Sequence, residues 1–145
     1  MKRLLSLAAS ALMAAGLGTG VVTVSSTSAH ADSCWDHNGS LMRLKASGNQ
    51  RWIYYEVPRD VLRRAGVQRG TLLFNGWKDG NSYSGTARRF SKYCPGQPLE
   101  YQVSGPVSPN QTKVTVYGDR EVHKRCVGTG RYKRDRLVFT YSHQC

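Results

Sequence analysis

Residues 74–94 read FNGWKDGNSYSGTARRFSKYC, and this stretch predicts a β-hairpin. Asp79-Gly80-Asn81 is a turn sequence whose residues tolerate positive φ angles. After the turn, Tyr83, Gly85 and Ala87 alternate with hydroxyl-bearing residues at a period of two, which indicates a strand with one face directed inward. Gly85 and Ala87 are small, so we expect a facing strand or a bulky ring to approach closely there.

The rest of the chain after residue 31 repeats this pattern. Short runs rich in β-branched and aromatic residues are separated by Gly, Asn, Asp and Pro, which is typical of strands joined by turns. Pro58–Gly66 differs, because it begins with proline, carries arginines near its end and finishes on glycine, which predicts a short helix. We therefore expect an all-β, single antiparallel β-meander or barrel-like domain with one short helix. The predicted strands are Leu41–Ala46, Arg51–Val57, Thr71–Trp77, Ser82–Phe90, Leu99–Val103, Lys113–Tyr117, Val127–Tyr132 and Arg136–Tyr141.

Residues 1–31 have the features of a secretory signal peptide. Lys2 and Arg3 precede an uncharged apolar run rich in small residues, and Ala29-His30-Ala31 matches an A-x-A cleavage site. A membrane anchor is the alternative, but Gly, Ser and Thr interrupt the run and no basic flank follows it. The signal is bacterial in style. We expect a periplasmic or extracellular protein without a transmembrane segment once the signal is removed.

The exported part, residues 32–145, is long enough for one domain and contains all four cysteines. An even number of cysteines in an oxidising compartment indicates two disulfide bonds, with three possible connectivities. We favour Cys34 with Cys145 and Cys94 with Cys126, because the outermost pair would tie the chain ends together. Neither C-x-x-C nor H-x-x-x-H spacing occurs, so we expect no metal site and no cofactor.

Basic side chains outnumber acidic ones. Lys2 and Arg3 are the only charged residues among residues 1–31, so residues 32–145 keep 19 basic and 9 acidic residues, a net charge of +10 at pH 7. Such a surface attracts polyanions, because guanidinium groups bind phosphates and nearby rings stack on bases. The alternative is that these basic side chains only form solvated strand edges and a charged helix face, which keep the sheet from pairing with neighbouring molecules. The expected partner is an anionic envelope polymer or a nucleic acid, and the candidate contact residues are Arg88, Arg89, Lys92, Arg131, Lys133, Arg134 and Arg136.

Five segments carry a resemblance to a group of proteins: CWDHNGSLMRL (34–44), YYEVPRDVLRRAGV (54–67), GTLLFNG (70–76), YSGTARRF (83–90) and LVFTYSHQC (137–145). With these segments the chain resembles small secreted cysteine-containing proteins of rhizobia and related alphaproteobacteria, over nearly the whole exported part. The resemblance implies export and disulfide bonding. It implies no activity, ligand or catalytic residue.

These features favour a noncatalytic, exported or envelope-associated binding module for an anionic partner. A protein inhibitor or interaction module is one alternative, and a secreted basic nuclease is another. A nuclease needs a general base, a general acid and cationic stabilisation, and the chain offers Glu56 or Glu100 with His123 or His143. No nucleophile elbow or phosphate-cradling glycine loop fixes their geometry, so we assign no catalytic residue.

Two further positions carry expectations. Asp36-His37-Asn38 is a polar group beside a cysteine, and it would form either a ligand-binding rim or, as we favour, the turn at Asn38-Gly39 into the next strand. In the second case Trp35 would cover one end of the core. Glu56 precedes Pro58, and we expect its carboxylate to pair with Arg59 or Arg63.

Overall fold

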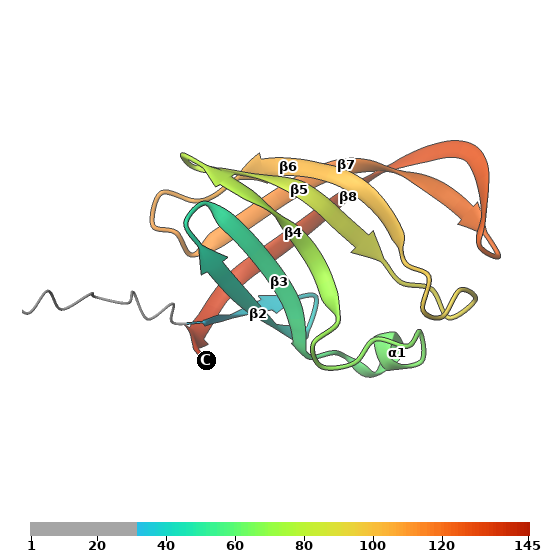
Figure 1. Cartoon of the computed structure of the whole chain (residues 1–145), viewed down its shortest axis with the longest axis horizontal. Helices are drawn as coiled ribbons and strands as arrows, with labels where there is room; N and C mark the ends of the chain where they lie inside the picture. Colours follow the sequence, from blue (N-terminus) through green and yellow to red (C-terminus); the bar gives the residue numbers. More distant parts are fainter. Residues whose placement is uncertain (1–31) are drawn as a thin grey trace, which may run out of the picture.

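The computed structural model describes residues 32–145, in which eight antiparallel strands close into one barrel (Figure 1). The strands follow one another in sequence order, and β8 pairs with β1 to close the sheet. The fold is all-β with one short helix, as the sequence predicted. The predicted signal peptide, residues 1–31, lies outside the described residues. The elements are β1 (Ser33–His37), β2 (Ser40–Ser47), β3 (Gln50–Val57), α1 (Asp60–Arg63), β4 (Leu72–Asp79), β5 (Ser82–Arg89), β6 (Leu99–Pro106), β7 (Lys113–Lys124) and β8 (Val127–Gln144).

The hairpin predicted around residue 80 is β4 and β5. Asp79 pairs with Ser82, and Gly80 has a φ angle of 54° in the turn. Gly76 and Gly85 are paired partners, and a Cβ atom on Gly85 would lie 2.6 Å from the Gly76 Cα atom and 2.3 Å from the Asn75 carbonyl oxygen. The expected close approach at Gly85 is therefore confirmed, because the two backbones leave no room for a side chain.

Side chains that alternate with outward-facing residues fill the barrel interior. Phe74, Phe139, Met42 and Ile53 are among the largest side chains with less than 2% of their surface exposed. Burying an apolar side chain of this size contributes about 1.5–3 kcal/mol. An eight-stranded barrel is just wide enough for its own side chains to fill the interior. The polar groups that remain accessible therefore lie at the ends of the barrel and on its outside.

The two ends of the barrel differ. Tight turns and the C-terminus lie at one end, and α1, the loop after β5 and the tip of the β7–β8 hairpin lie at the other (Figure 1); we call these the turn end and the α1 end. The disulfide between Cys34 and Cys145 ties the chain termini at the turn end, and that between Cys94 and Cys126 joins the loop after β5 to the β7–β8 hairpin. Both pairings agree with the favoured connectivity.

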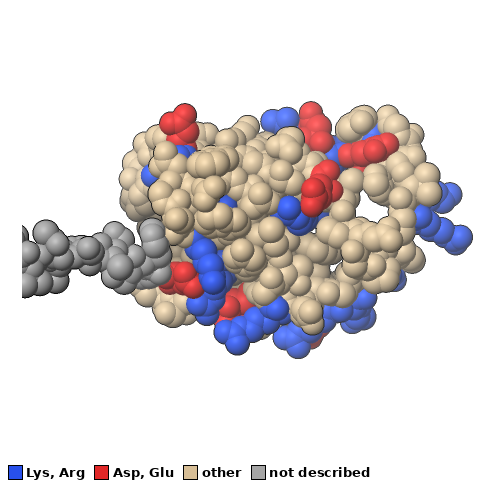
Figure 2. All heavy atoms as spheres, viewed as in Figure 1, with Lys and Arg blue, Asp and Glu red and all other residues tan. Residues whose placement is uncertain are grey.

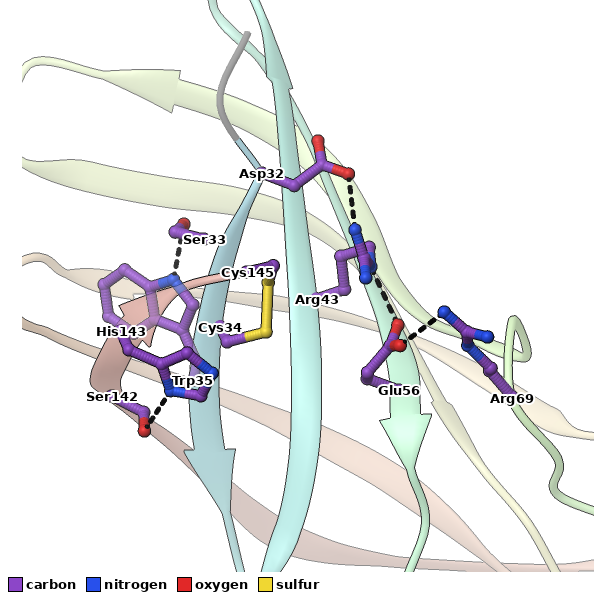
Figure 3. The surroundings of a disulfide bond; sticks show 10 residues. All are labelled: Asp32, Ser33, Cys34, Trp35, Arg43, Glu56, Arg69, Ser142, His143 and Cys145. Atoms are coloured by element: carbon purple, nitrogen blue, oxygen red, sulfur yellow. Dashed lines mark hydrogen bonds and ion pairs between the residues drawn. A yellow bond between two sulfur atoms is a disulfide. The ribbon is translucent and has the colours of Figure 1, made fainter.

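A chain of ion pairs lies beside the first disulfide (Figure 3). Arg43 contacts Asp32 at 3.0 Å on one side and Glu56 at 2.7 Å on the other, and Arg69 contacts Glu56 at 2.7 Å. The hydrogen bond from Arg43, with a smaller contribution from Arg69, lowers the pKa of Glu56 despite its partial burial. The predicted pairing of Glu56 with Arg59 or Arg63 is wrong, because the Glu56 side chain faces β2 across the sheet instead of the helix.

The C-terminal strands are longer than predicted. The predicted strands Val127–Tyr132 and Arg136–Tyr141 are one strand, β8, and β7 continues past its predicted end at Tyr117 to Lys124. The pairing of β6 with β7 is limited to Ser104 with Tyr117 and an isolated bridge further along. Beyond this point β7 stays paired with β8 alone, as a hairpin that projects past the barrel. In this hairpin the first eight residues of β8 are exposed. Their charged side chains reach solvent, so they do not interrupt the strand.

Two smaller predictions concern the ends of the chain. Asn38-Gly39 forms the turn into β2, with φ angles of 51° and 78°, and Trp35 is buried in the core, edge-on to Tyr141; both agree with the favoured interpretation. Strand β1, which precedes that turn, was not predicted. Within residues 32–145, no helix has the length and apolar composition required to span a membrane.

Candidate functional site

A pocket of about 170 Å³ opens at the α1 end of the barrel; we call it the mouth pocket. Its side chains come from the last inward-facing positions of several strands. In β5, Ala87 is fully buried and faces the interior, so Arg89, two residues further on, is directed inward at the barrel mouth. The same alternation places polar side chains of β1, β3, β6 and β8 around this opening. The polar residues that form its wall include His37, Tyr55, Arg59, Arg89, Tyr101 and Asp135.

Asp135 organises the inner part of the mouth pocket. The Tyr101 hydroxyl donates a hydrogen bond of 2.7 Å to Asp135 Oδ2. Arg120 Nε lies 3.4 Å and Arg89 Nη1 3.9 Å from the same oxygen. Burial and the bond to Asp135 raise the pKa of Tyr101, so its hydroxyl stays protonated and donates. One carboxylate here faces two guanidinium groups, which leaves the cluster with an excess of positive charge.

His37 closes one side of the pocket and is only 7% exposed. Its Nδ1 atom lies 2.8 Å from the Val138 carbonyl oxygen, which can only accept, so Nδ1 carries the proton. Its ring stacks on Phe139 with the ring centroids 4.6 Å apart. Burial lowers the pKa of His37, with a further contribution from the positive charge of Arg59, and the imidazole is neutral at pH 7.

Arg59 is an exposed cation of the mouth pocket. It follows β3, and its backbone N–H donates a 3.1 Å hydrogen bond to the hydroxyl of Ser40, a fully buried residue. The side chain is exposed and forms no ion pair within the described part of the chain. Its charge also acts on Tyr55. Burial raises the pKa of Tyr55 to about 12, and the positive charge of Arg59 makes this rise smaller than burial alone would. The Tyr55 hydroxyl donates no hydrogen bond to any residue of the described barrel, so it is available to a ligand.

The structure brings only some of the predicted contact residues to this pocket. Arg88 and Arg89 both line it, but Arg88 is also held on the outer face by Glu100 at 3.1 Å and by Asn75 at 2.7 Å. Lys92 lies in the loop after β5, over the ring of Tyr93. Of these three basic residues, Arg89 is therefore the one that both lines the pocket and lies close to Asp135.

The other predicted contact residues lie along β8. Arg136 lines the mouth pocket, and Arg134 pairs with Asp119 at 3.4 Å and covers the ring of Tyr117. The remaining two, Arg131 and Lys133, lie on the projecting hairpin, and no carboxylate of the described residues pairs with either. Tyr132 between them is 69% exposed. The basic residues of β8 thus form a basic strip that continues from the pocket onto the projecting hairpin and uses both faces of the strand, with Arg131 and Lys133 on one face and Arg134 and Arg136 on the other.

The groups considered for nuclease chemistry do not come together. His143 lies near the C-terminus at the turn end, whereas His123 lies on the projecting hairpin, 3.4 Å from Glu121. Glu56 and Glu100 are each engaged by arginines. Among residues 32–145, no three His, Cys, Asp or Glu side chains are grouped as metal ligands.

Sequence reasoning missed Arg59, Tyr55, Tyr101 and Asp135 as site residues. Tyr55, Tyr101 and Asp135 are unremarkable in the sequence, because a single polar residue in an alternating strand carries no signal that it faces inward. The available signal was the alternation of the strands: two residues before buried Leu137, Asp135 occupies an inward-facing position. Applying this alternation to the ends of the strands would have selected these three residues, whereas Arg59 lies between β3 and α1, outside any strand.

The fold and site define a class: a small, closed, eight-stranded antiparallel barrel held by two disulfide bonds, with a cationic pocket at one mouth. Comparison of the chain with family models, curated proteins and solved structures finds no match in any of the three. The geometry of the described residues is therefore the basis for a functional proposal.

Proposed function

We propose that this chain is an exported, noncatalytic binding module whose cationic α1 end binds an anionic polymer. The observation that carries the proposal is Arg59 at the rim of the mouth pocket. It has no carboxylate partner within residues 32–145, and its charge reaches both His37 and Tyr55. A cation held in this way, beside a free hydroxyl, is ready to pair with a phosphate or carboxylate.

The strip along β8 supports a polymer rather than a single small anion as the partner. Arg136 borders the pocket, and Arg131 and Lys133 continue the positive charge along the exposed part of β8, while Tyr132 on the opposite face of the strand is available for stacking. Lys and Arg side chains also gather along the lower margin and at the hairpin end of the molecule in Figure 2. An acidic envelope polysaccharide, lipopolysaccharide or nucleic acid presents negative charges at intervals along such a strip.

Export supports the same proposal. Disulfide bonds form and persist in oxidising compartments, and this chain has two. The signal-like residues 1–31 and the resemblance to secreted rhizobial proteins agree with a periplasmic or extracellular location. An anionic envelope polymer is then the partner that such a protein meets first.

The test is a salt titration of binding between the oxidised protein and single-stranded RNA, with the protein's own envelope fraction in parallel. Each phosphate contact contributes about 0.7 to the slope of log K against log salt for single strands. The double variant Arg59→Gln/Arg136→Gln should therefore lower the slope by about 1.4. Lys45→Gln/Lys113→Gln removes the same charge away from the mouth pocket and serves as the control. An equal effect of both double variants, or binding that does not respond to salt, would contradict the proposal.

A further inference from the structure

A second cavity, of about 540 Å³, lies between the loop after β5 and the projecting β7–β8 hairpin. The disulfide between Cys94 and Cys126 joins the loop to the hairpin and forms part of the cavity wall, so we call it the disulfide cavity. Figure 2 shows the molecule hollowed and open at this end. The volume falls within the range of small-molecule sites, about 300–1,000 Å³. It is therefore large enough for a small organic ligand.

Arg120 is the feature of this cavity that most needs explanation. Its side chain is 11% exposed and belongs to the cavity wall. The guanidinium group donates no hydrogen bond to any residue between 32 and 145, and its Nε atom is fully buried without a partner. Within residues 32–145, the only carboxylate within 4.0 Å of it is Asp135, at 3.4 Å, whose Oδ2 atom already accepts from Tyr101. A guanidinium has five N–H donors, and buried polar groups are nearly always hydrogen-bonded.

The other acidic groups of the wall are not available to Arg120. Glu100 pairs with Arg88 on the outer face, and Glu121 accepts from the Gly130 backbone N–H and lies 3.4 Å from His123. The acceptor that Arg120 lacks is therefore not supplied by a neighbouring carboxylate. An anion entering the cavity would supply acceptors to the terminal Nη groups of Arg120, and a bidentate carboxylate matches the planar fork of a guanidinium.

Another part of the wall is apolar. Phe90, Pro98 and Leu99 line the cavity, and Phe90 also packs edge-on against Tyr55 in the core. A small inorganic anion would satisfy the guanidinium but leave this surface uncovered. A ligand with both a carboxylate and an apolar body covers both parts of the wall.

We propose that the disulfide cavity binds a small organic carboxylate, with the carboxylate paired to Arg120 and the apolar body packed against Phe90 and Leu99. This inference does not depend on the polymer-binding proposal, which rests on Arg59 and the basic strip of β8. The disulfide fixes the loop between Phe90 and Leu99, the first residue of β6, relative to the hairpin. The cavity is therefore formed before the ligand arrives.

The test uses 4-phenylbutyrate and its neutral amide as probes, with binding to the oxidised protein followed by amide chemical shifts and calorimetry. We expect saturable binding of the carboxylate and binding of the amide at least 10-fold weaker, because hydrogen bonds to charged groups are worth this factor or more. The perturbed amides should lie in residues 90–100 and 120–126. Absence of saturable carboxylate binding, or equal binding of the amide, would overturn the proposal.

Variants separate a specific contact from the loss of net charge. Arg120→Gln should weaken carboxylate binding at least 10-fold, whereas Arg134→Gln, which removes one charge from the outer face, should change it less than 3-fold. The shift map of the unaltered protein does not depend on whether the Arg120 variant folds. Perturbations centred on Arg59 and His37 instead would overturn the disulfide-cavity proposal and leave the mouth pocket as the anion site. Loss of polymer binding in the salt titration would leave the cavity proposal unaffected.

Discussion

His37 is the one mouth-pocket residue whose charge can change near neutral pH. The Nδ1–H donor to Val138 fixes the tautomer of the neutral ring, while Nε2 lies 3.5 Å from the Asn38 side-chain nitrogen. Burial and Arg59 favour the neutral ring, whereas the hydrogen bond to Val138 and the negative charges of Asp36 and Asp135 favour the protonated ring. The balance lowers the pKa of His37. An anion bound beside Arg59 would offset the arginine's charge and shift that balance.

We predict that anion binding at the mouth pocket raises the pKa of His37. The bound state then takes up a proton more readily than the free state. Binding should therefore tighten as the pH falls from above 6.5 into the range between the pKa of His37 in the bound state and its lower pKa in the free state. The measurement is a pH titration of the His37 ring signals by NMR, with and without a short single-stranded RNA. His37→Gln should remove this part of the pH dependence of binding. A His37 pKa that is unchanged by the RNA would show that the anion lies elsewhere.

At the scale of elements, the β4–β5 hairpin follows from its sequence and the β7–β8 hairpin does not. The first has a short turn and a buried face, so alternation and turn residues predict both strands and their pairing. The second projects beyond the barrel, where the first eight residues of β8 are exposed and no apolar alternation marks them. For the same reason the candidate site was only partly predictable. Sequence clustering found Arg89 and Arg136, whereas Asp135 becomes visible only when the strands are paired around the barrel.

The contact between Gly76 and Gly85 predicts the effect of a single methyl group. A Cβ atom at Gly85 would overlap the Asn75 carbonyl oxygen and the Gly76 Cα atom, so Gly85→Ala must push β4 and β5 apart. We expect a loss of about 1–3 kcal/mol in the free energy of unfolding, as for overpacked interiors. Ser84→Ala, on the neighbouring outward-facing residue, should change it by less than about 0.5 kcal/mol. Urea denaturation of the two variants decides this, and equal midpoints would disprove the close contact.

At the scale of the whole molecule, the two disulfides close loops of different length. Cys34 and Cys145 are 111 residues apart in sequence, and Cys94 and Cys126 are 32 apart. The first restricts nearly the whole unfolded chain and ties the strands that close the barrel. The second holds the hairpin that forms the disulfide cavity. The first bridge therefore serves mainly stability, whereas the second also shapes a binding surface.

Loop-closure entropy gives the expected difference between these bridges. The stabilisation grows as 1.5 RT times the logarithm of loop length, so the separations of 111 and 32 residues predict a difference of about 1 kcal/mol. Cys34→Ala/Cys145→Ala should therefore lower the free energy of unfolding by about 1 kcal/mol more than Cys94→Ala/Cys126→Ala. Only the latter should also weaken 4-phenylbutyrate binding. An equal or larger loss of stability from removing the Cys94 bridge would argue against this account.

The charge of the molecule is also uneven. Six of the nine carboxylates in residues 32–145 lie within 4.0 Å of an arginine, so most negative charge is already paired. Lys and Arg far outnumber the carboxylates, and those with no carboxylate partner within residues 32–145 include Arg59, Arg136, Arg131 and Lys133. The excess positive charge therefore extends from the mouth pocket along β8, which is the basis of the central claim.

The most direct test of that claim is an NMR map of where an anionic polymer contacts the oxidised protein. A short single-stranded RNA, added at low salt, should perturb amides around Arg59 and Arg89 and along residues 131–136, and these shifts should disappear as salt is raised. The turn end, with its first disulfide and its tight turns, should remain unperturbed. Shifts spread evenly over the barrel, or centred on the turn end, would contradict a binding role for the mouth pocket.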